Sequence, residues 1–429
     1  MAQSDSKKGF VMLNNEINTV WNTIELIIIV MLTLLLTGCG DGGNINAPVA
    51  VTSPGTGGLP PRSPTVAANV VPVTVGVGAA GLFNQPNISV VICVPGSATQ
   101  CQTIDNILVD TGSTGLRIFN SVLSPQIASA LPATNMGRGQ LAECERFALS
   151  FSWGSVRTAD LKVRGESASS LPIQIIGDLP QASVPTSCSA NSVSDNTVAE
   201  FGSNGVLGVS VRPNDCGDTC TAANQKYYVC TGSTCSPTAV PLAQQIPNPV
   251  SRFPVDNNGV ILKLDAIPDS GAASVVGTLT FGIDTQSNNV LAAAQRYTTD
   301  ASGNLPNSLY NGLPVTAFLD SGTPTLDFYD STLPACSATI GTSYFCPTTP
   351  QTRSVTLVGQ HGETGIASFN VTDAQTLFGT PGNFAFNNLG SSQDGPGTVN
   401  LGLSFFFGRT VYSGIDQTAS GGPAPFVAF

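Results

Sequence analysis

From residue 70 onward the sequence consists of short runs rich in valine, isoleucine, threonine and phenylalanine, separated by turn-forming residues. Many of these runs alternate apolar and polar side chains, which is typical of strands with one buried face. The 45 glycines and 30 prolines supply the breaks between them. Helical patterns are short and fall at 125–131, 238–246 and 373–379. We therefore expect an all-β protein with a few short helices. The clearest strand-like runs are 70–78, 88–94, 102–112, 146–154, 171–178, 260–267, 277–284, 315–322, 353–359 and 405–416.

Length and charge limit the classes of function. A chain of 429 residues exceeds the size at which one hydrophobic core stops growing, so two lobes are expected. The net charge of −11 disfavours nucleic acid as a partner. The one histidine, His361, lies in the polar stretch "VGQHGETG", where we expect a surface loop. Any Ser-His-Asp machinery would have to use that residue, and a His-rich metal site is excluded.

The N-terminal segment has the features of an export signal. Residues 24–37 form an apolar run that is shorter than a comfortable membrane span, and small residues precede Cys39. The sequence "LTGC" at 36–39 resembles the lipobox of bacterial lipoproteins, which implies a signal peptide over 1–38 and a lipidated Cys39. Gly40 after the cysteine implies the periplasmic face of the outer membrane. An ordinary membrane anchor or a signal without lipidation is the alternative.

Residues 39–69 lack periodicity and are dense in glycine, proline, serine and threonine, so we expect a flexible linker. Without Cys39, the 11 cysteines leave an even number, which suits disulfides in an exported chain. A zinc site made by the cysteines at 216, 220, 230 and 235 is the alternative. Proximity along the chain suggests the pairs Cys93–Cys101, Cys216–Cys220, Cys230–Cys235 and Cys336–Cys346, which leaves Cys144 with Cys188.

Two carboxylates stand at the ends of apolar runs and are followed by sharp turns. "ILVDTGS" ends at residue 113, and "AFLDSGT" ends at residue 323. An apolar-Gly segment follows each turn, at 206–208 and at 401–402. This weak internal repeat suggests one carboxylate per lobe. We place the lobes at 70–247 and 248–429.

This order of parts resembles the pepsin-like aspartic proteases over nearly the whole chain after residue 70. The resemblance implies a bilobal fold with a cleft between the lobes. It implies that Asp110 and Asp320 are catalytic, act on a peptide through an activated water, and require no metal or cofactor. The residues implied to support the pair are Thr111, Gly112, Ser113, Ser321, Gly322 and Thr323. The pattern is also similar to a branch of bacterial lipoproteins without an assigned activity.

Some positions depart from the family pattern. Trp153 and Gly154 lie in "LSFSWGS", where the family has its flap hairpin and usually presents a tyrosine. Arg117 replaces the usual aromatic residue after the first motif, and we expect it to point outward at a solvated edge. If it pointed inward, its charge would lower the pKa values of the pair. Asn400 stands where the closing strand is usually apolar.

We therefore expect a monomeric aspartic endopeptidase that is anchored by lipid in the bacterial envelope and is most active in acid. Its partners would be a peptide or protein substrate and the membrane, without nucleic acid. The alternative is a weakly active or inactive pepsin-like scaffold, whose cleft binds extended peptides or envelope proteins through strand-like hydrogen bonds. Loss of peptide cleavage on replacing either carboxylate would distinguish the two.

Overall fold

The computed structural model describes residues 67–148, 150–190 and 192–429. Ala68–Cys336 together with Ser343–Phe429 forms one compact unit, so the lobe boundary at 247/248 stays a prediction. The signal peptide predicted over 1–38, Cys39 and all but the last residues of the linker lie outside the described residues. Strands dominate and the helices are very short, which confirms the expected all-β class. No helix in the described part is long and apolar enough to cross a membrane.

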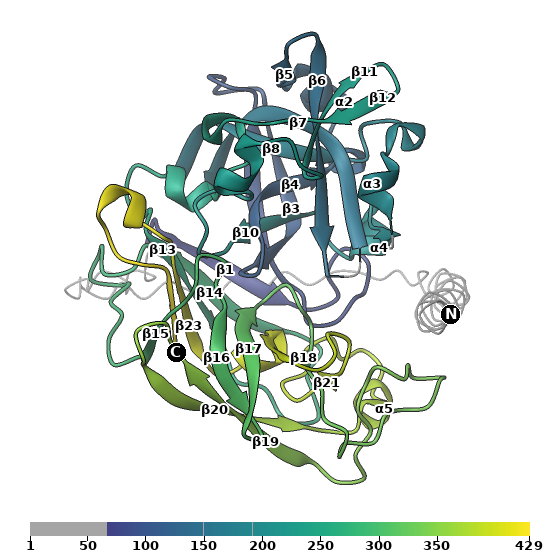
Figure 1. Cartoon of the computed structure of the whole chain (residues 1–429), viewed down its shortest axis with the longest axis vertical. Helices are drawn as coiled ribbons and strands as arrows, with labels where there is room; N and C mark the ends of the chain where they lie inside the picture. The colour runs from purple at the N-terminus through teal and green to yellow at the C-terminus, as the bar shows by residue number, and fades with distance from the viewer. Residues whose placement is uncertain (1–66, 149, 191) are drawn as a thin grey trace, which may run out of the picture. The chain divides into compact units, whose positions relative to one another are not determined.

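The first half of the described chain forms strands β1 to β12 (Figure 1). Their alternating burial follows from the sequence, as in β1, where the side chains of Val71, Val73 and Val75 are buried and those between them are not. The bounds are β1 Val70–Val75, β2 Pro86–Cys93, β3 Cys101–Asp110, β4 Thr114–Phe119, β5 Asn135–Met136, β6 Gly139–Phe147, β7 Ser150–Val163, β8 Glu166–Ile176, β9 Val193–Ser194, β10 Gly205–Val209, β11 Tyr227–Thr231 and β12 Thr234–Pro237.

The second half forms strands β13 to β24. Several of these strands make a separate seven-stranded sheet, which contains β16 to β22. The bounds are β13 Gly259–Leu264, β14 Val275–Phe281, β15 Arg296–Thr298, β16 Leu305–Tyr310, β17 Leu313–Asp320, β18 Leu326–Phe328, β19 Gln351–Val358, β20 Thr364–Val371, β21 Gly390–Ser391, β22 Thr398–Gly402, β23 Thr410–Gly414 and β24 Phe426–Ala428.

Two of the three predicted helices form. The segment at 125–131 is α2, where Pro125 occupies the first turn and the Ser124 hydroxyl accepts a hydrogen bond from the Ile127 amide at 3.3 Å. The segment at 373–379 is α5, and the one at 238–246 contains only the 3₁₀ turn η5. The α-helices are α2 Pro125–Ala130, α3 Thr186–Ser189, α4 Val198–Phe201, α5 Ala374–Phe378 and α6 Leu403–Phe406, and the 3₁₀ turns are η2 Asn120–Val122, η3 Gln181–Ser183, η4 Gly217–Thr221, η5 Leu242–Gln244, η6 Pro249–Arg252 and η7 Thr418–Ser420.

The same three-strand unit occurs once in each half. In the first half, β10 runs parallel to β3 and antiparallel to β4, with Gly208 opposite Asp110. In the second half, β22 runs parallel to β17 and antiparallel to β18, with Gly402 opposite Asp320. A Cβ atom on Gly208 would lie 2.7 Å from the Thr114 amide nitrogen, so the apolar-Gly pattern leaves room for the turn that follows each carboxylate. The internal repeat in the sequence is thus a structural repeat.

A run of paired strands from both halves connects the two three-strand units. The pairing order is β2–β1–β14–β13–β23–β24–β15, and every pair in it is antiparallel. Figure 1 shows β1, β13 and β14 between the strands β3, β4 and β10 on one side and β16 to β19 on the other. One continuous hydrophobic core includes Ile107, Leu262 and Leu401 from all three regions. The expected bilobal β architecture is therefore present, with its lobes connected by a shared sheet.

All five predicted disulfides are present, with Cα–Cα distances from 3.9 to 5.8 Å. Two of them, Cys93–Cys101 and Cys230–Cys235, join directly paired residues of neighbouring strands. The four cysteines of the alternative zinc site are all in disulfides and have no free thiolates to offer a metal.

Candidate active site

Each motif carboxylate is held by the turn that follows it. The backbone amides of Gly112 and Ser113 donate to Asp110 Oδ1 at 2.7 and 3.2 Å, and the Ser113 hydroxyl donates to Asp110 Oδ2. These bonds stabilise the ionised form and fix the orientation of the carboxyl group.

The second motif repeats this arrangement. The Gly322 amide donates to Asp320 Oδ1 at 2.8 Å, and the Thr323 hydroxyl donates to Asp320 Oδ2 at 2.8 Å. The Thr323 hydroxyl also accepts a bond from the Asn400 side-chain amide at 3.0 Å. Asn400, at the position that is usually apolar, therefore helps to orient the hydroxyl that binds Asp320.

Hydrogen bonds exchanged between the two turns bring the motifs together. The Thr111 amide donates to the Ser321 hydroxyl oxygen at 3.1 Å, and the Ser321 amide donates to the Thr111 hydroxyl oxygen at 2.9 Å. Both hydroxyls then donate to the strands before the opposite turn, Thr111 to the Leu319 carbonyl at 3.2 Å and Ser321 to the Val109 carbonyl at 2.7 Å. Both side chains are buried, so these bonds are protected from water.

The two glycines allow the carboxylates to approach each other. A Cβ atom on Gly112 would lie 2.5 Å from the Asp320 carboxyl carbon, and one on Gly322 would lie 2.6 Å from the Asp110 carboxyl carbon. Real Cβ atoms do not come this close to other heavy atoms. Each carboxyl group therefore packs against the glycine of the opposite turn, and any side chain there would separate the pair.

Burial and mutual repulsion change the protonation of the pair. The Asp110 side chain is buried, which together with the neighbouring charge of Asp320 raises the pKa of Asp110 to about 8. The bonds from Ser113 and Gly112 lower the pKa of Asp110 by less than these two effects raise it. Two carboxylates this close cannot both ionise easily, so the pair holds one proton at neutral pH.

Asp320 of the pair lines a cleft of about 240 Å³, and the turn after Asp110 reaches the same cleft through Thr111 and Gly112. Gly112 and Asp320 line it together with apolar side chains and one arginine, Arg212. The full lining is Thr111, Gly112, Val211, Arg212, Ser302, Gly303, Asn304, Phe318, Leu319, Asp320, Ser413 and Val427. A separate polar hollow of about 420 Å³ is lined by the ion pair of Asp330 and Arg353 and contains neither motif carboxylate.

The model of a family described as a protein of unknown function, DUF3443, matches residues 65–429. The chain belongs to the DUF3443 family. A search of curated proteins finds no match. Among solved structures, one match is the crystal structure of the aspartic proteinase from Irpex lacteus, at 18% identity and a TM-score of 0.48, covering 84% of this chain and 97% of that chain.

In this DUF3443 protein, Trp153 and Gly154 are part of the core. The Trp153 indole is 1% exposed, packs edge-on against Tyr228 and donates from its ring nitrogen to the Ser183 hydroxyl at 3.2 Å. Gly154 is pressed against the backbone of Ile175 on the neighbouring strand β8. A side chain enclosed in the core cannot cover a cleft, so the burial of Trp153 argues against the flap role that we expected for it.

Our expectation that Arg117 points to a solvated edge is wrong. Its side chain is fully buried, donates to the Glu143 carboxylate through Nε at 3.1 Å and Nη2 at 2.7 Å, and also bonds Glu145. Lys226 pairs with the same acids, and Glu143 and Asp215 are also almost completely buried. Arg117 Nη1 donates to the Thr114 carbonyl at 2.8 Å, which connects this cluster to the first motif turn. Strand β4 pairs with β10 on one edge and with β8 on the other, and all six of its residues are buried, so neither of its faces reaches solvent.

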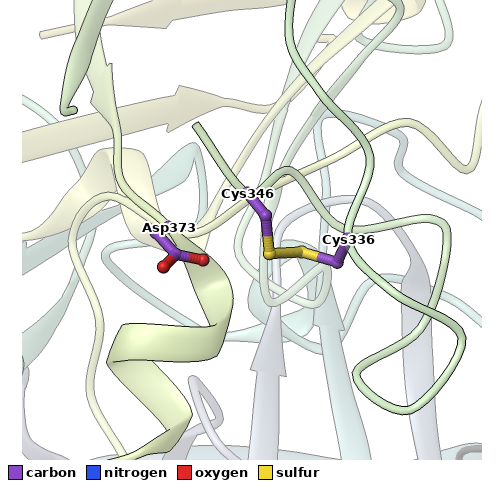
Figure 2. Close-up of side chains that lie close together, drawn as sticks. All are labelled: Cys336, Cys346 and Asp373. Atoms are coloured by element: carbon purple, nitrogen blue, oxygen red, sulfur yellow. A yellow bond between two sulfur atoms is a disulfide. The ribbon is translucent and has the colours of Figure 1, made fainter. Parts of the chain in front are cut away.

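Two groups of potential metal ligands lie close together in the described part, but neither offers a suitable site. Cys336, Cys346 and Asp373 are neighbours, yet the two sulfur atoms form a disulfide (Figure 2). The second group is Glu143, Glu145 and Asp215, whose oxygens are already engaged by Arg117 and Lys226.

His361 is exposed on its loop, as expected.

Proposed function

We propose that the chain is an aspartic endopeptidase in which Asp110 and Asp320 activate a water between them. The observation that carries this proposal is the pair itself. The two carboxyl groups stand on duplicated turns, accept hydrogen bonds from equivalent donors and approach each other past two glycines, and one of them, Asp320, lines a cleft. A structural role alone gives no reason to place a buried carboxylate, Asp110, against a second carboxylate that lines a cleft.

The difference between the two environments assigns the roles. Asp110, whose pKa is raised by burial and by the neighbouring carboxylate, carries the proton, which leaves Asp320 to act as the general base. The oxygen of the water attacks the carbonyl carbon of the peptide while Asp320 takes a proton from that water. Asp110 gives its proton to the carbonyl oxygen. When the tetrahedral intermediate breaks down, Asp320 returns its proton to the departing amine nitrogen, and Asp110 recovers one from the intermediate's hydroxyl group. Both carboxyls then regain their starting states.

The neighbouring groups maintain this arrangement. Ser113 and Thr323 orient the outer oxygens of the carboxyl groups, and the bonds exchanged by Thr111 and Ser321 hold the turns in register. Such preorganisation means that little rearrangement is needed as charge develops during the reaction.

A peptide-binding scaffold without activity is the second candidate. The burial of Trp153 favours it, because this side chain does not cover the cleft as we expected. Such a scaffold would bind peptides in the same cleft without cutting them.

The test is an unbiased peptide library incubated with the full chain, disulfides intact, between pH 3 and 9. Asp110→Asn and Asp320→Asn should each abolish cleavage, whereas Asp265→Asn, at an exposed carboxylate, should not. Cleavage that survives in either of the first two variants would exclude the two-carboxylate mechanism. Peptide binding without cleavage by folded wild-type protein would support the scaffold.

We also propose that the enzyme is a monomer tethered through a lipidated Cys39 to the periplasmic face of a bacterial outer membrane. The support is the sequence of residues 24–40 and the location of both carboxylates on one chain. Cys39→Ser should move the protein from the membrane fraction to the soluble one, and light scattering of the detergent-free product should give the mass of one chain. Retention in the membrane would contradict the lipid anchor.

A further inference from the structure

Arg212 occupies a fixed position beside the carboxylate pair. It follows β10, and its backbone amide donates to the Ser210 hydroxyl at 3.2 Å. The Ser210 amide in turn donates to the Ser113 carbonyl at 3.0 Å, and its hydroxyl shares a hydrogen bond with Thr114 at 2.5 Å. The segment that carries Arg212 is therefore attached directly to the first motif turn.

The guanidinium group lies on the cleft wall. Arg212 Nη2 donates to the Ser302 hydroxyl at 2.8 Å, and Nη1 donates to the Asp215 carbonyl at 3.5 Å. Ser302 lines the cleft on the turn between β15 and β16. The Asp300 carboxylate shapes this turn by accepting bonds from the amides of Ser302 and Asn304 at 2.8 and 2.9 Å.

Within the described part of the chain, no carboxylate forms an ion pair with Arg212. The ion pairs of the described residues use Arg117, Arg157, Lys226 and Arg353, but not Arg212. Two nearby acids bind other groups. The Asp215 carboxylate contacts the Tyr227 hydroxyl and Lys226, and the Asp300 carboxylate accepts a hydrogen bond from the amide of Ser302 in its own turn.

Among the residues that line the cleft, Arg212 is the cation and Asp320 the anion, and the others are neutral. A half-buried guanidinium whose donors are only partly used is suited to binding a carboxylate, since its planar fork matches two carboxylate oxygens.

We propose that Arg212 is a specificity residue that binds a carboxylate of the peptide close to the scissile bond. This inference rests on the proposed peptidase function, because it places the peptide in the cleft beside Asp320. The carboxylate is either the side chain of an aspartate or glutamate, or the free C-terminus of a short product-like peptide. Both sources offer the same chemistry to the guanidinium.

The test uses peptides identified from the library and made in matched pairs that differ only by Glu or Gln near the cut. Each is prepared with a free or an amidated C-terminus. We expect wild-type protein to prefer Glu over Gln by on the order of tenfold, because a charge-assisted hydrogen bond replaces a neutral one. A preference for the free over the amidated C-terminus would instead identify the terminal carboxylate as the ligand.

Arg212→Gln should reduce the preference to about one, mainly through KM, and Arg212→Lys should restore part of it. Arg212→Glu should favour a peptide with Lys at the same position. Arg252→Gln, at an exposed arginine on η6, is the matched control and should keep the wild-type preference. A preference unchanged in Arg212→Gln, with cleavage intact, overturns the proposal for Arg212 while the peptidase function stands.

Binding of the same fluorescent peptides, measured by anisotropy, separates the two proposals. Arg212-dependent binding of the Glu peptide without cleavage supports the carboxylate site and overturns the peptidase function. Protein that neither binds nor cleaves any of the peptides overturns both. Raised salt should weaken binding of the Glu peptide more than binding of the Gln peptide, because salt screens the ionic interaction with Arg212.

Discussion

Replacing Asp110 by asparagine should change how stability depends on pH. In the wild-type protein the pKa of Asp110 rises from its ordinary value of 3.8 to about 8, chiefly because folding buries it. Because the folded-state pKa lies above the unfolded one, the stability linked to this group is fully present below about pH 4. It is then lost progressively as the pH rises through about 8. Asparagine does not titrate, so the variant lacks this loss.

The magnitude follows from the size of the shift. Between pH 4 and 8 the folded state holds one proton at Asp110 that the unfolded state has released. The free energy of unfolding therefore falls by about 1.4 kcal/mol per pH unit relative to the variant. Across the whole window the difference accumulates to about 6 kcal/mol in favour of Asp110→Asn. Loss of hydrogen bonds to the carboxylate shifts the variant's curve by an amount that does not depend on pH, so the slope is the informative quantity.

The measurement is guanidinium chloride unfolding of the full chain, disulfides intact, at half-unit steps from pH 4.5 to 8.5. The midpoint of wild type should fall steadily relative to that of Asp110→Asn as the pH rises, and the midpoint of Asp265→Asn should follow wild type. Parallel curves for wild type and Asp110→Asn would show that Asp110 is not protonated in the folded protein. The assignment of the shared proton would then be wrong, whatever the catalytic result.

Three further predictions concern the pair and its surroundings. Peptidase activity needs the proton on Asp110, so it should extend from acid toward neutral pH and decline as the pH rises through about 8; a pH profile that falls well below neutrality would contradict this. Gly322→Ala should abolish activity in a folded protein, because its Cβ atom would displace Asp110, and wild-type turnover by a variant with an unchanged circular dichroism spectrum would refute the packing argument. Arg117→Met should destabilise the fold by about 3 to 5 kcal/mol, because Glu143 and Glu145 lose a buried partner; equal unfolding midpoints for Arg117→Met and wild type would show that the cluster contributes little.

Much of the fold was predictable because it depends on local patterns. Strand-like runs, turns and the two short helices α2 and α5 follow from side-chain periodicity and from residues such as Pro125. Four disulfides join cysteines that are close in sequence, and Cys144 with Cys188 followed because the other cysteines were already paired. The carboxylates were found because strand, turn and apolar-Gly segment recur in the same order.

Only the tertiary structure decided the contacts between distant segments. The alternation of side chains along one strand does not specify these contacts. Arg117 is buried because both faces of its strand are covered, and its charge is matched by Glu143 and Glu145, which come from another strand. Trp153 lies on a strand whose buried face could not be known before its neighbours were placed. The sequence alone therefore determined the β class, the disulfides and the two motif turns. The folded chain decided which charged groups are paired, and it placed Arg212 on the cleft wall without an ion-pair partner among the residues that the structure describes, because burial and pairing depend on three-dimensional neighbours.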